Sequence, residues 1–260
     1  MGFLRLLCLG SLLLLLLLPA AAGAQLEEDP TDLIDVPTAA MIPGASYDTA
    51  LRLYSGGGVL LRVRVGLRES ILFGFSFGGT NVLGTGDPDW NPRVEFLIKG
   101  LLLRESYLGP ALALGYNSQG YGRYDDGTDR YHVKSRGFYA VASKHFLFLG
   151  DVGFHGGVNY SLERDDGDEE VNLFFGLEKS IHSHLDLLVE YDVATNDNET
   201  NELFGEGRGY LNAGLLWRVT DTLHFEIDFR NLIENGEKSG EVKDPGEWSR
   251  EIQIVYRDYF

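Results

Sequence analysis

The sequence predicts an all-β protein that follows a cleaved signal peptide and folds as a single closed antiparallel transmembrane β-barrel of about 12 strands. Three observations predict this fold. Apolar and polar residues alternate along many segments, and most of these segments are about 10 or 11 residues long. Strands of soluble proteins are typically shorter, at about 5–6 residues. The connections also alternate between short turns and long polar loops, as in outer-membrane barrels.

The first 24 residues have the pattern of a secretory signal peptide. Arg5 precedes a leucine run at 12–18, and Ala22-Gly23-Ala24 offers a cleavage site before Gln25. The alternative is a transmembrane anchor, but the apolar stretch is short for a full span. We therefore expect a signal peptide at 1–24, an N-terminal segment at 25–44 and a barrel at 45–260. After the signal peptide, no apolar run of about 20 residues predicts a helical span.

Twelve candidate strands account for residues 45–260. They are 45–55, 58–68, 70–80, 91–103, 108–118, 135–146, 150–162, 169–180, 184–194, 209–220, 222–232 and 250–260. In segment 58–68, for example, Leu61 and Val63 fall on one face, and Arg62 and Arg64 fall on the other. An even number of strands lets the last strand pair with the first, which removes both sheet edges. Only segment 135–146 has no cleanly apolar face.

Charged residues on the polar faces of these strands are the candidate site residues. An arginine or lysine on the lipid face costs roughly 2–4 kcal/mol at mid-membrane, so we expect the charges to face the lumen. The candidate pore-lining charges are Arg62, Arg64, Arg93, Glu95, Lys99, Glu178, Asp186, Glu190, Asp192, His224, Glu226, Asp228 and Arg230. Basic residues concentrate on strands 58–68 and 91–103, and acidic residues on strands 169–180, 184–194 and 222–232. The two walls either pair and fill the lumen, which we favour, or line a conducting pore.

The two ends of the mature chain carry further predictions. Segment 25–44 is acidic, so it could fold into the lumen against the arginines or stay in the periplasm. We expect it in the periplasm or at the entrance of the lumen. The last residues alternate and end on an aromatic, which resembles the assembly signal of outer-membrane proteins. The residues of this signal are Ile254, Tyr256 and Phe260. The barrel assembly machinery and outer-membrane lipid are therefore expected partners, and Phe260 is expected in a periplasmic aromatic girdle.

The long loops hold the remaining candidate sites. The acidic loop 164–170 does not have the spacing of an EF-hand, so we expect a solvated turn. Tyrosines and aspartates in the loop 119–134 could bind sugars by ring stacking and hydrogen bonding. His132 is the one histidine expected at the outer rim, and no G-x-S-x-G motif is present. We therefore predict no enzyme, no catalytic residues, no cofactor and no metal. The net charge of −17 argues against nucleic-acid binding.

Several phrases of the sequence are similar to those of a known family. They are DLIDVPTAAM, FLIKGLLLRESYLGPALALGYNSQG, GFYAVASKHF and GFHGGVNY, within residues 30–160. This stretch resembles the YjbH family of bacterial outer-membrane proteins. The resemblance implies an outer-membrane location and a structural or transport role in export or organisation of surface exopolysaccharide, with polysaccharide or its export proteins as partners. The alternatives are a small general diffusion porin and a soluble periplasmic ligand-binding β-barrel.

Overall fold

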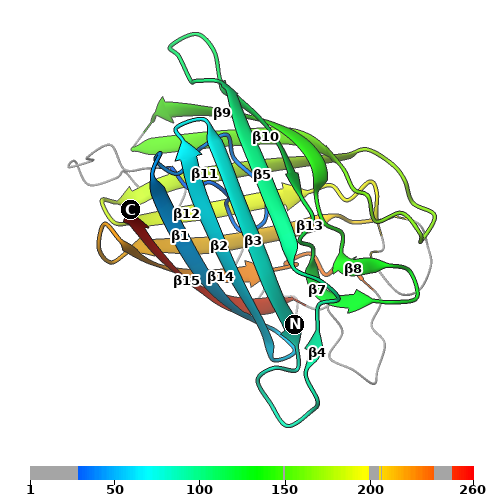
Figure 1. The fold of residues 1–260 in the computed structure, drawn as a ribbon. Helices are drawn as coiled ribbons and strands as arrows, with labels where there is room; N and C mark the ends of the chain where they lie inside the picture. The colour runs from blue at the N-terminus through cyan, green and yellow to red at the C-terminus, as the bar shows by residue number, and fades with distance from the viewer. Residues whose placement is uncertain (1–28, 149, 199–204, 206, 237–247) are drawn as a thin grey trace, which may run out of the picture.

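The computed structural model describes residues 29–148, 150–198, 205, 207–236 and 248–260. The predicted signal peptide lies outside these residues. Twelve strands form one ring: β1 (Ser46–Tyr54), β2 (Gly58–Arg68), β3 (Ile71–Thr80), β5 (Glu95–Leu103), β6 (Ala111–Asn117), β9 (Gly137–Leu147), β10 (Asp151–Tyr160), β11 (Asn172–His182), β12 (Leu185–Asp192), β13 (Tyr210–Arg218), β14 (Leu223–Arg230) and β15 (Ser249–Tyr259). The prediction of a closed antiparallel barrel is confirmed (Figure 1).

Pairing between the first and last strands closes the ring. β1 and β15 run antiparallel from the pair Ser46 and Tyr259 to the pair Leu53 and Ile252. Beyond β15, the backbone N–H of Phe260 donates to the carbonyl of Ala45 at 2.9 Å. The C-terminus lies at one end of the barrel, and strands β7 and β8 lie at the other (Figure 1). The C-terminal end carries the short turns, such as 69–70 and 183–184.

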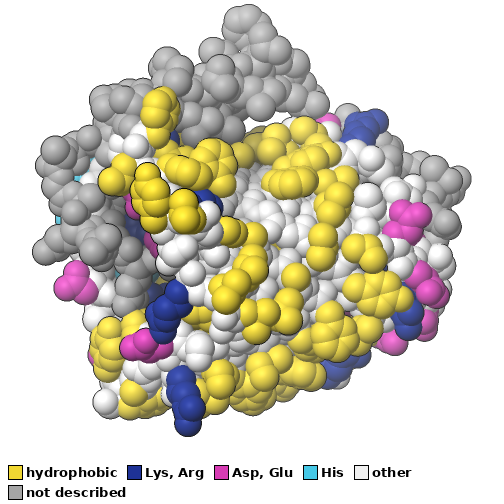
Figure 2. Space-filling view, turned by 90° about the horizontal axis from the view of Figure 1, so that it is seen from above, with side chains coloured by type: hydrophobic (Ala, Val, Ile, Leu, Met, Phe, Trp, Pro, Cys, Tyr) yellow, Lys and Arg dark blue, Asp and Glu magenta, His cyan; other side chains and the backbone are white. Residues whose placement is uncertain are grey.

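The strands turn their apolar residues outward and their charged residues inward. On β5, Phe96 and Ile98 are 46% and 48% exposed, whereas Glu95 and Lys99 are fully buried. Figure 2 shows hydrophobic side chains spread over the strands on one face, with charged side chains mainly near its edges. Within the described residues, no helix is long and apolar enough to cross a membrane, a test that concerns helices alone.

In the loops that the structure describes, three short strands occur that were not predicted. β4 (Asp89–Trp90) pairs with the end of β3, and β7 (Tyr121–Asp125) pairs with β8 (Arg130–Val133) as a hairpin. The hairpin belongs to the long connection between β6 and β9, and its residues Arg130 and Tyr131 are 1% and 0% exposed. It therefore packs against the barrel at the long-loop end and does not extend into solvent.

Residues 29–44, which we call the lumen segment, lie inside the barrel. Each of three buried apolar clusters among the described residues contains part of this segment. Leu33 packs on β12 and β13, Val36 and Ala39 on β6, β9 and β11, and Ile42 on β3 and β5. At Gly176 of β11, a Cβ atom would come within 2.3 Å of the Leu33 side chain, so the glycine leaves room for the segment. The apolar core of the barrel is built around this segment.

Candidate functional site

The acidic side chains of the lumen segment face the basic wall of the barrel. Asp32 Oδ2 lies 2.5 Å from Arg64 Nη1 and 3.7 Å from Arg62 Nη1. Arg64 also holds Asp48 of β1 with two hydrogen bonds, at 2.8 and 2.7 Å. Lys99 Nζ donates to the backbone carbonyl of Thr31 at 2.7 Å. The segment thus supplies both carboxylate and carbonyl acceptors to cations that β2 and β5 carry into the lumen.

The backbone of the same segment faces the acidic wall. Glu190 Oε2 on β12 accepts hydrogen bonds from the N–H groups of Ile34, Asp35 and Val36, at 3.1, 2.9 and 2.8 Å. The other oxygen of Glu190 accepts from Asn212 Nδ2 at 2.7 Å. Three N–H donors around one carboxylate oxygen stabilise its charge in a buried position. The segment therefore bridges walls of opposite charge.

Asp35 links the lumen segment to the strands that close the barrel. Its carboxylate pairs with Arg52 of β1, at 2.9 Å, and with Arg230 of β14. Glu251 of β15 lies 3.5 Å from the Arg52 guanidinium and 3.3 Å from that of Arg230. The guanidinium carbon of Arg230 lies 3.5 Å from the centre of the Tyr121 ring, which belongs to the β7–β8 hairpin. One buried network thus connects the segment, the closing strands and the hairpin.

The structure places most of the predicted pore-lining charges inside the barrel. Those that are buried or half-buried are Arg62, Arg64, Glu95, Lys99, Glu178, Asp186, Glu190, Asp192, His224, Glu226, Asp228 and Arg230. Arg93 is the exception, because the strand begins only at Glu95. Its side chain is 50% exposed at the barrel rim and lies 3.1 Å from Glu95. Pro92, which has no N–H for a strand ladder, accounts for the later start.

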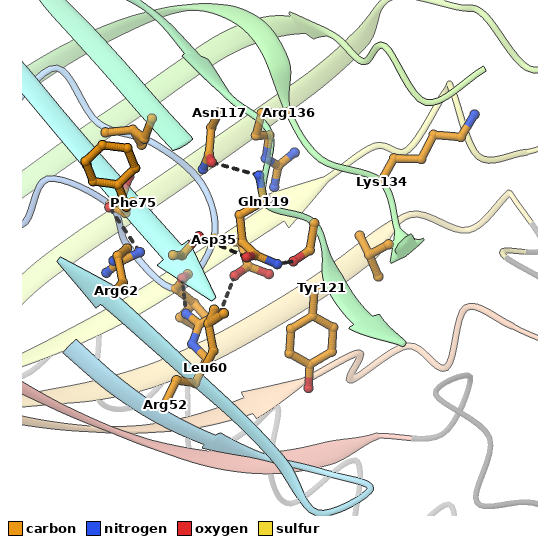
Figure 3. A pocket seen from close by; sticks show the side chains of 17 residues that line it. Asp35, Arg52, Leu60, Arg62, Phe75, Asn117, Gln119, Tyr121, Lys134 and Arg136 are labelled. Atoms are coloured by element: carbon orange, nitrogen blue, oxygen red, sulfur yellow. Dashed lines mark hydrogen bonds and ion pairs between the residues drawn. The ribbon is translucent and has the colours of Figure 1, made fainter. Parts of the chain in front are cut away.

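A small cavity remains between the lumen segment and the β7–β8 hairpin (Figure 3). Its lining includes Asp35, Arg52, Arg62, Gln119 and Tyr121, and its volume is about 60 Å³. Pockets that bind small organic ligands have volumes of about 300–1,000 Å³. In the described conformation, this cavity is therefore large enough for a few water molecules and too small for a sugar.

Several loop predictions differ from the structure. In the acidic loop, predicted as a solvated turn, Asp165, Glu169 and Glu170 are exposed, but Asp168 is buried and Asp166 pairs with Arg130 and Lys134 at 2.5 and 2.8 Å, so the turn is only partly solvated. The rings of Tyr124 and Tyr131 pack edge to face with centroids 5.0 Å apart. Both rings are buried, so neither presents a free face to a sugar. His132, expected at the outer rim, is buried in β8.

Glu163 fastens the hairpin to the neighbouring loop. Its Oε2 accepts from the N–H groups of Tyr131 and Ser135, at 3.1 and 3.2 Å. Burial raises the pKa of this loop carboxyl to about 7, although those hydrogen bonds and the charge of Arg130 act in the opposite direction.

The raised pKa predicts that the hairpin docks more firmly at pH 5 than at pH 8. Below the ordinary pKa of a glutamate, the buried carboxyl is neutral and carries no ionisation cost. As pH rises through about 7, Glu163 must ionise while buried, so docking weakens. Hydrogen-exchange protection factors of residues 121–133 measure this difference. In Glu163→Gln the difference should disappear, and an unchanged pH dependence in that variant would refute the assignment.

Lys144 and His145 of β9, in the segment 135–146 for which the sequence showed no cleanly apolar face, make contacts at the short-turn end. Both contact the carboxylate of Glu105: Lys144 Nζ lies 2.9 Å from its Oε1, and His145 Nδ1 lies 2.7 Å from its Oε2. His145 lies beside His155 of β10 and Glu178 of β11. Sequence analysis missed this group because its members come from three strands. The available signal was that His155 interrupts an otherwise neutral stretch of strand.

Comparisons with known proteins find similarity only among solved structures. No protein family model and no curated protein matches the sequence. The KdgM porin is 7% identical over 83% of this chain and 99% of that chain, with a TM-score of 0.49. The NanC porin is 10% identical over 82% of this chain and 99% of that chain, with a TM-score of 0.44. The outer membrane protein Omp33 of Acinetobacter baumannii is 7% identical over 83% of this chain and 97% of that chain, with a TM-score of 0.41. Similarity this low carries no conclusion about the activity of this chain, and the resemblance to the YjbH family stays a prediction.

Proposed function

We propose that this chain is an outer-membrane β-barrel whose lumen is closed by its own lumen segment, and that solutes pass only when the segment moves. The observation that carries the proposal is the position of residues 29–44, which contribute to all three apolar clusters of the described interior and pair with both charged walls. An unobstructed diffusion pore would need these residues elsewhere.

The membrane part of the proposal rests on the outer surface. Exposed apolar side chains occur along the middle of many strands, for example Val63 on β2, Phe75 on β3, Ile98 on β5 and Ile227 on β14. Apolar surface is stabilised by about 25 cal/mol for each Å² removed from water. Lipid would cover this surface, whereas a soluble periplasmic barrel would leave it in water. The short turns and the C-terminus would then lie on the periplasmic side.

The finer role that we propose is export or organisation of surface exopolysaccharide. Its support is the resemblance of residues 30–160 to the YjbH family. The alternative, a small diffusion porin, becomes compatible with the fold if the lumen segment leaves the barrel. Loss of surface polysaccharide in a deletion strain, restored by the intact gene, would support the polysaccharide role. Normal polysaccharide in that strain would count against it and leave the gated pore as the role to test.

Conductance in planar bilayers tests the closed lumen directly. We expect few or no unitary current steps from the mature chain, residues 25–260. The Asp32→Asn/Asp35→Asn variant should open frequently, because it loses the ion pairs to Arg64, Arg52 and Arg230 and keeps the apolar contacts. A variant without residues 29–42 should conduct continuously.

A matched control has the same change of charge outside the lumen. Asp126→Asn/Asp165→Asn alters two exposed loop residues and should behave like the parent chain. Heat-modifiable migration on gels verifies that each variant is a folded barrel. If the parent chain conducts as freely as the folded variant without residues 29–42, the segment does not close the lumen.

A further inference from the structure

We propose that His145, His155 and Glu178 form a binding site for a divalent metal ion of the zinc type, in the short-turn half of the barrel interior. One ligand atom from each residue lies within 4.8 Å of the other two. The three residues come from the neighbouring strands β9, β10 and β11, which hold their backbones in a fixed register. A site on paired strands is rigid before any ion arrives.

Backbone register explains why the three side chains meet. Gly153 of β10 lies opposite His145 on one side and Glu178 on the other. A Cβ atom at Gly153 would come within 2.7 Å of both His145 Nε2 and Glu178 Oε1. The glycine therefore leaves the space in which the side chains from β9 and β11 approach each other across β10.

The distances suit a tetrahedral ion after small side-chain rotations. Glu178 Oε1 lies 2.8 Å from His145 Nε2 and 3.8 Å from His155 Nε2. Zinc binds histidine nitrogen and carboxylate oxygen at about 2.0–2.2 Å, which places two ligand atoms about 3.3–3.6 Å apart. The two observed distances lie on either side of this range.

The other ring nitrogens of both histidines are already occupied. His145 Nδ1 lies 2.7 Å from Glu105 Oε2, and His155 Nδ1 lies 2.8 Å from Ser143 Oγ. Metal-binding histidines almost always use their second nitrogen for such an outer hydrogen bond, which fixes the ring and leaves the first nitrogen for the metal. Here that arrangement directs both Nε2 atoms to the carboxylate of Glu178.

Two polar atoms in the group have no hydrogen-bond partner among the described residues. They are Nε2 of His155, whose side chain is fully buried, and Oε2 of Glu178. Buried polar atoms are nearly always paired. An ion pair between a protonated His145 and Glu178 would account for the short contact between these two side chains. It would still leave His155 Nε2 and Glu178 Oε2 without a partner. A bound cation gives a partner to both.

The donor set selects the class of metal. Two imidazole nitrogens and a carboxylate suit zinc and its neighbours among the transition metals, whereas calcium and magnesium prefer sites built from oxygen. Asp29 Oδ2 lies 3.6 Å from His145 Nε2 and could complete the coordination. Ser143 Oγ also accepts the N–H of Ala39. A bound ion would therefore fasten the lumen segment to β9, although the site itself does not depend on the proposed transport role.

Zinc titration of the folded mature chain tests this site. The protein is refolded in detergent, treated with EDTA and titrated with Zn²⁺ against a chromogenic chelator. We expect one equivalent of Zn²⁺ to bind tightly to each chain. His155→Gln and Glu178→Gln should each weaken it by at least about 100-fold, and Ser143→Ala, which alters an outer partner, by about 10- to 100-fold. Heat-modifiable migration identifies the folded variants.

A second pair of histidines provides the control. His182 ends β11 and His184 lies in the β11–β12 turn; their ring centroids are 6.3 Å apart and both residues are exposed, so they could bind zinc at the surface. The His182→Ala/His184→Ala variant should keep the tight equivalent. The proposal fails if the parent chain binds no zinc, if this control loses the tight equivalent, or if either folded His155→Gln or folded Glu178→Gln retains the parent affinity. If neither of these two variants folds, a folded Ser143→Ala variant that retains the parent affinity also overturns the proposal.

Discussion

Replacing Arg64 with methionine should lower the free energy of unfolding by about 3–5 kcal/mol, the cost of leaving buried charges without their partner. Arg64 is 3% exposed and binds both Asp48 and Asp32. Without it, the nearest cations are Arg257, 3.5 Å from Asp48, and Arg62, 3.7 Å from Asp32. These longer contacts offset only part of the loss. Urea titration of the barrel in lipid vesicles measures the change.

Two companion variants separate burial from charge alone. Arg64→Lys keeps the charge but not the planar fork that binds Asp48 through two nitrogens, so its loss should be intermediate. Arg104→Met removes the partner of Glu69 in an exposed pair, with side chains 65% and 76% exposed, and should cost about 0–1 kcal/mol. Equal losses from Arg64→Met and Arg104→Met would contradict the buried network.

The Ile98→Arg substitution should destabilise the membrane-inserted barrel by about 2–4 kcal/mol, the depth-dependent cost of a cation on the lipid face near mid-membrane. Ile98 lies on the outer face of β5 between Phe73 and Tyr116, and it is 48% exposed. Urea titration in vesicles is again the measurement, together with the yield of heat-modifiable protein.

The same substitution at the end of the strand is the matched control. Leu103, the last residue of β5, is 56% exposed, and Leu103→Arg should cost about 0–1 kcal/mol because it lies near the membrane surface. In a water-soluble barrel, both substitutions would be ordinary surface changes within about 0.5 kcal/mol. Two such small and equal effects would contradict the lipid-facing assignment.

Alternation along the strands and the alternating loop lengths were sufficient to predict the barrel, because most strands of a transmembrane barrel have one apolar and one polar face. Predicted and observed strand bounds differ by only a few residues, and the largest shifts occur beside Pro92, Pro110 and the acidic loop. The hairpin of β7 and β8 was missed. Its residues do not alternate, and its stability comes from Asp166, Asp197 and Glu163, which are distant in sequence.

The lumen segment explains why one strand could not be assigned a face. Tyr139 and Val141 of β9 point inward but are apolar, because they pack on Val36 and Ala39. Leu188 of β12 is an inward apolar residue for the same reason, since it contacts Leu33. Apolar residues on a lumen face were therefore a signal that something apolar fills the lumen. The sequence pattern alone could not identify residues 29–44 as that occupant, because alternation shows which face of a strand a residue occupies but not which distant segment it contacts.

Oxygen accessibility of spin labels along β3 tests the central claim most directly, since residues 25–260 contain no cysteine and single labels can be placed there. Phe75 and Phe77 lie on the outer face, at 49% and 40% exposed, and Ser76 between them is 6% exposed beside the cavity. In vesicles, we predict high accessibility to oxygen and low accessibility to a water-soluble nickel reagent for labels at 75 and 77, and low accessibility to both at 76. Labels at 75 and 77 that the nickel reagent reaches as readily as it reaches a loop label would contradict a barrel embedded in lipid.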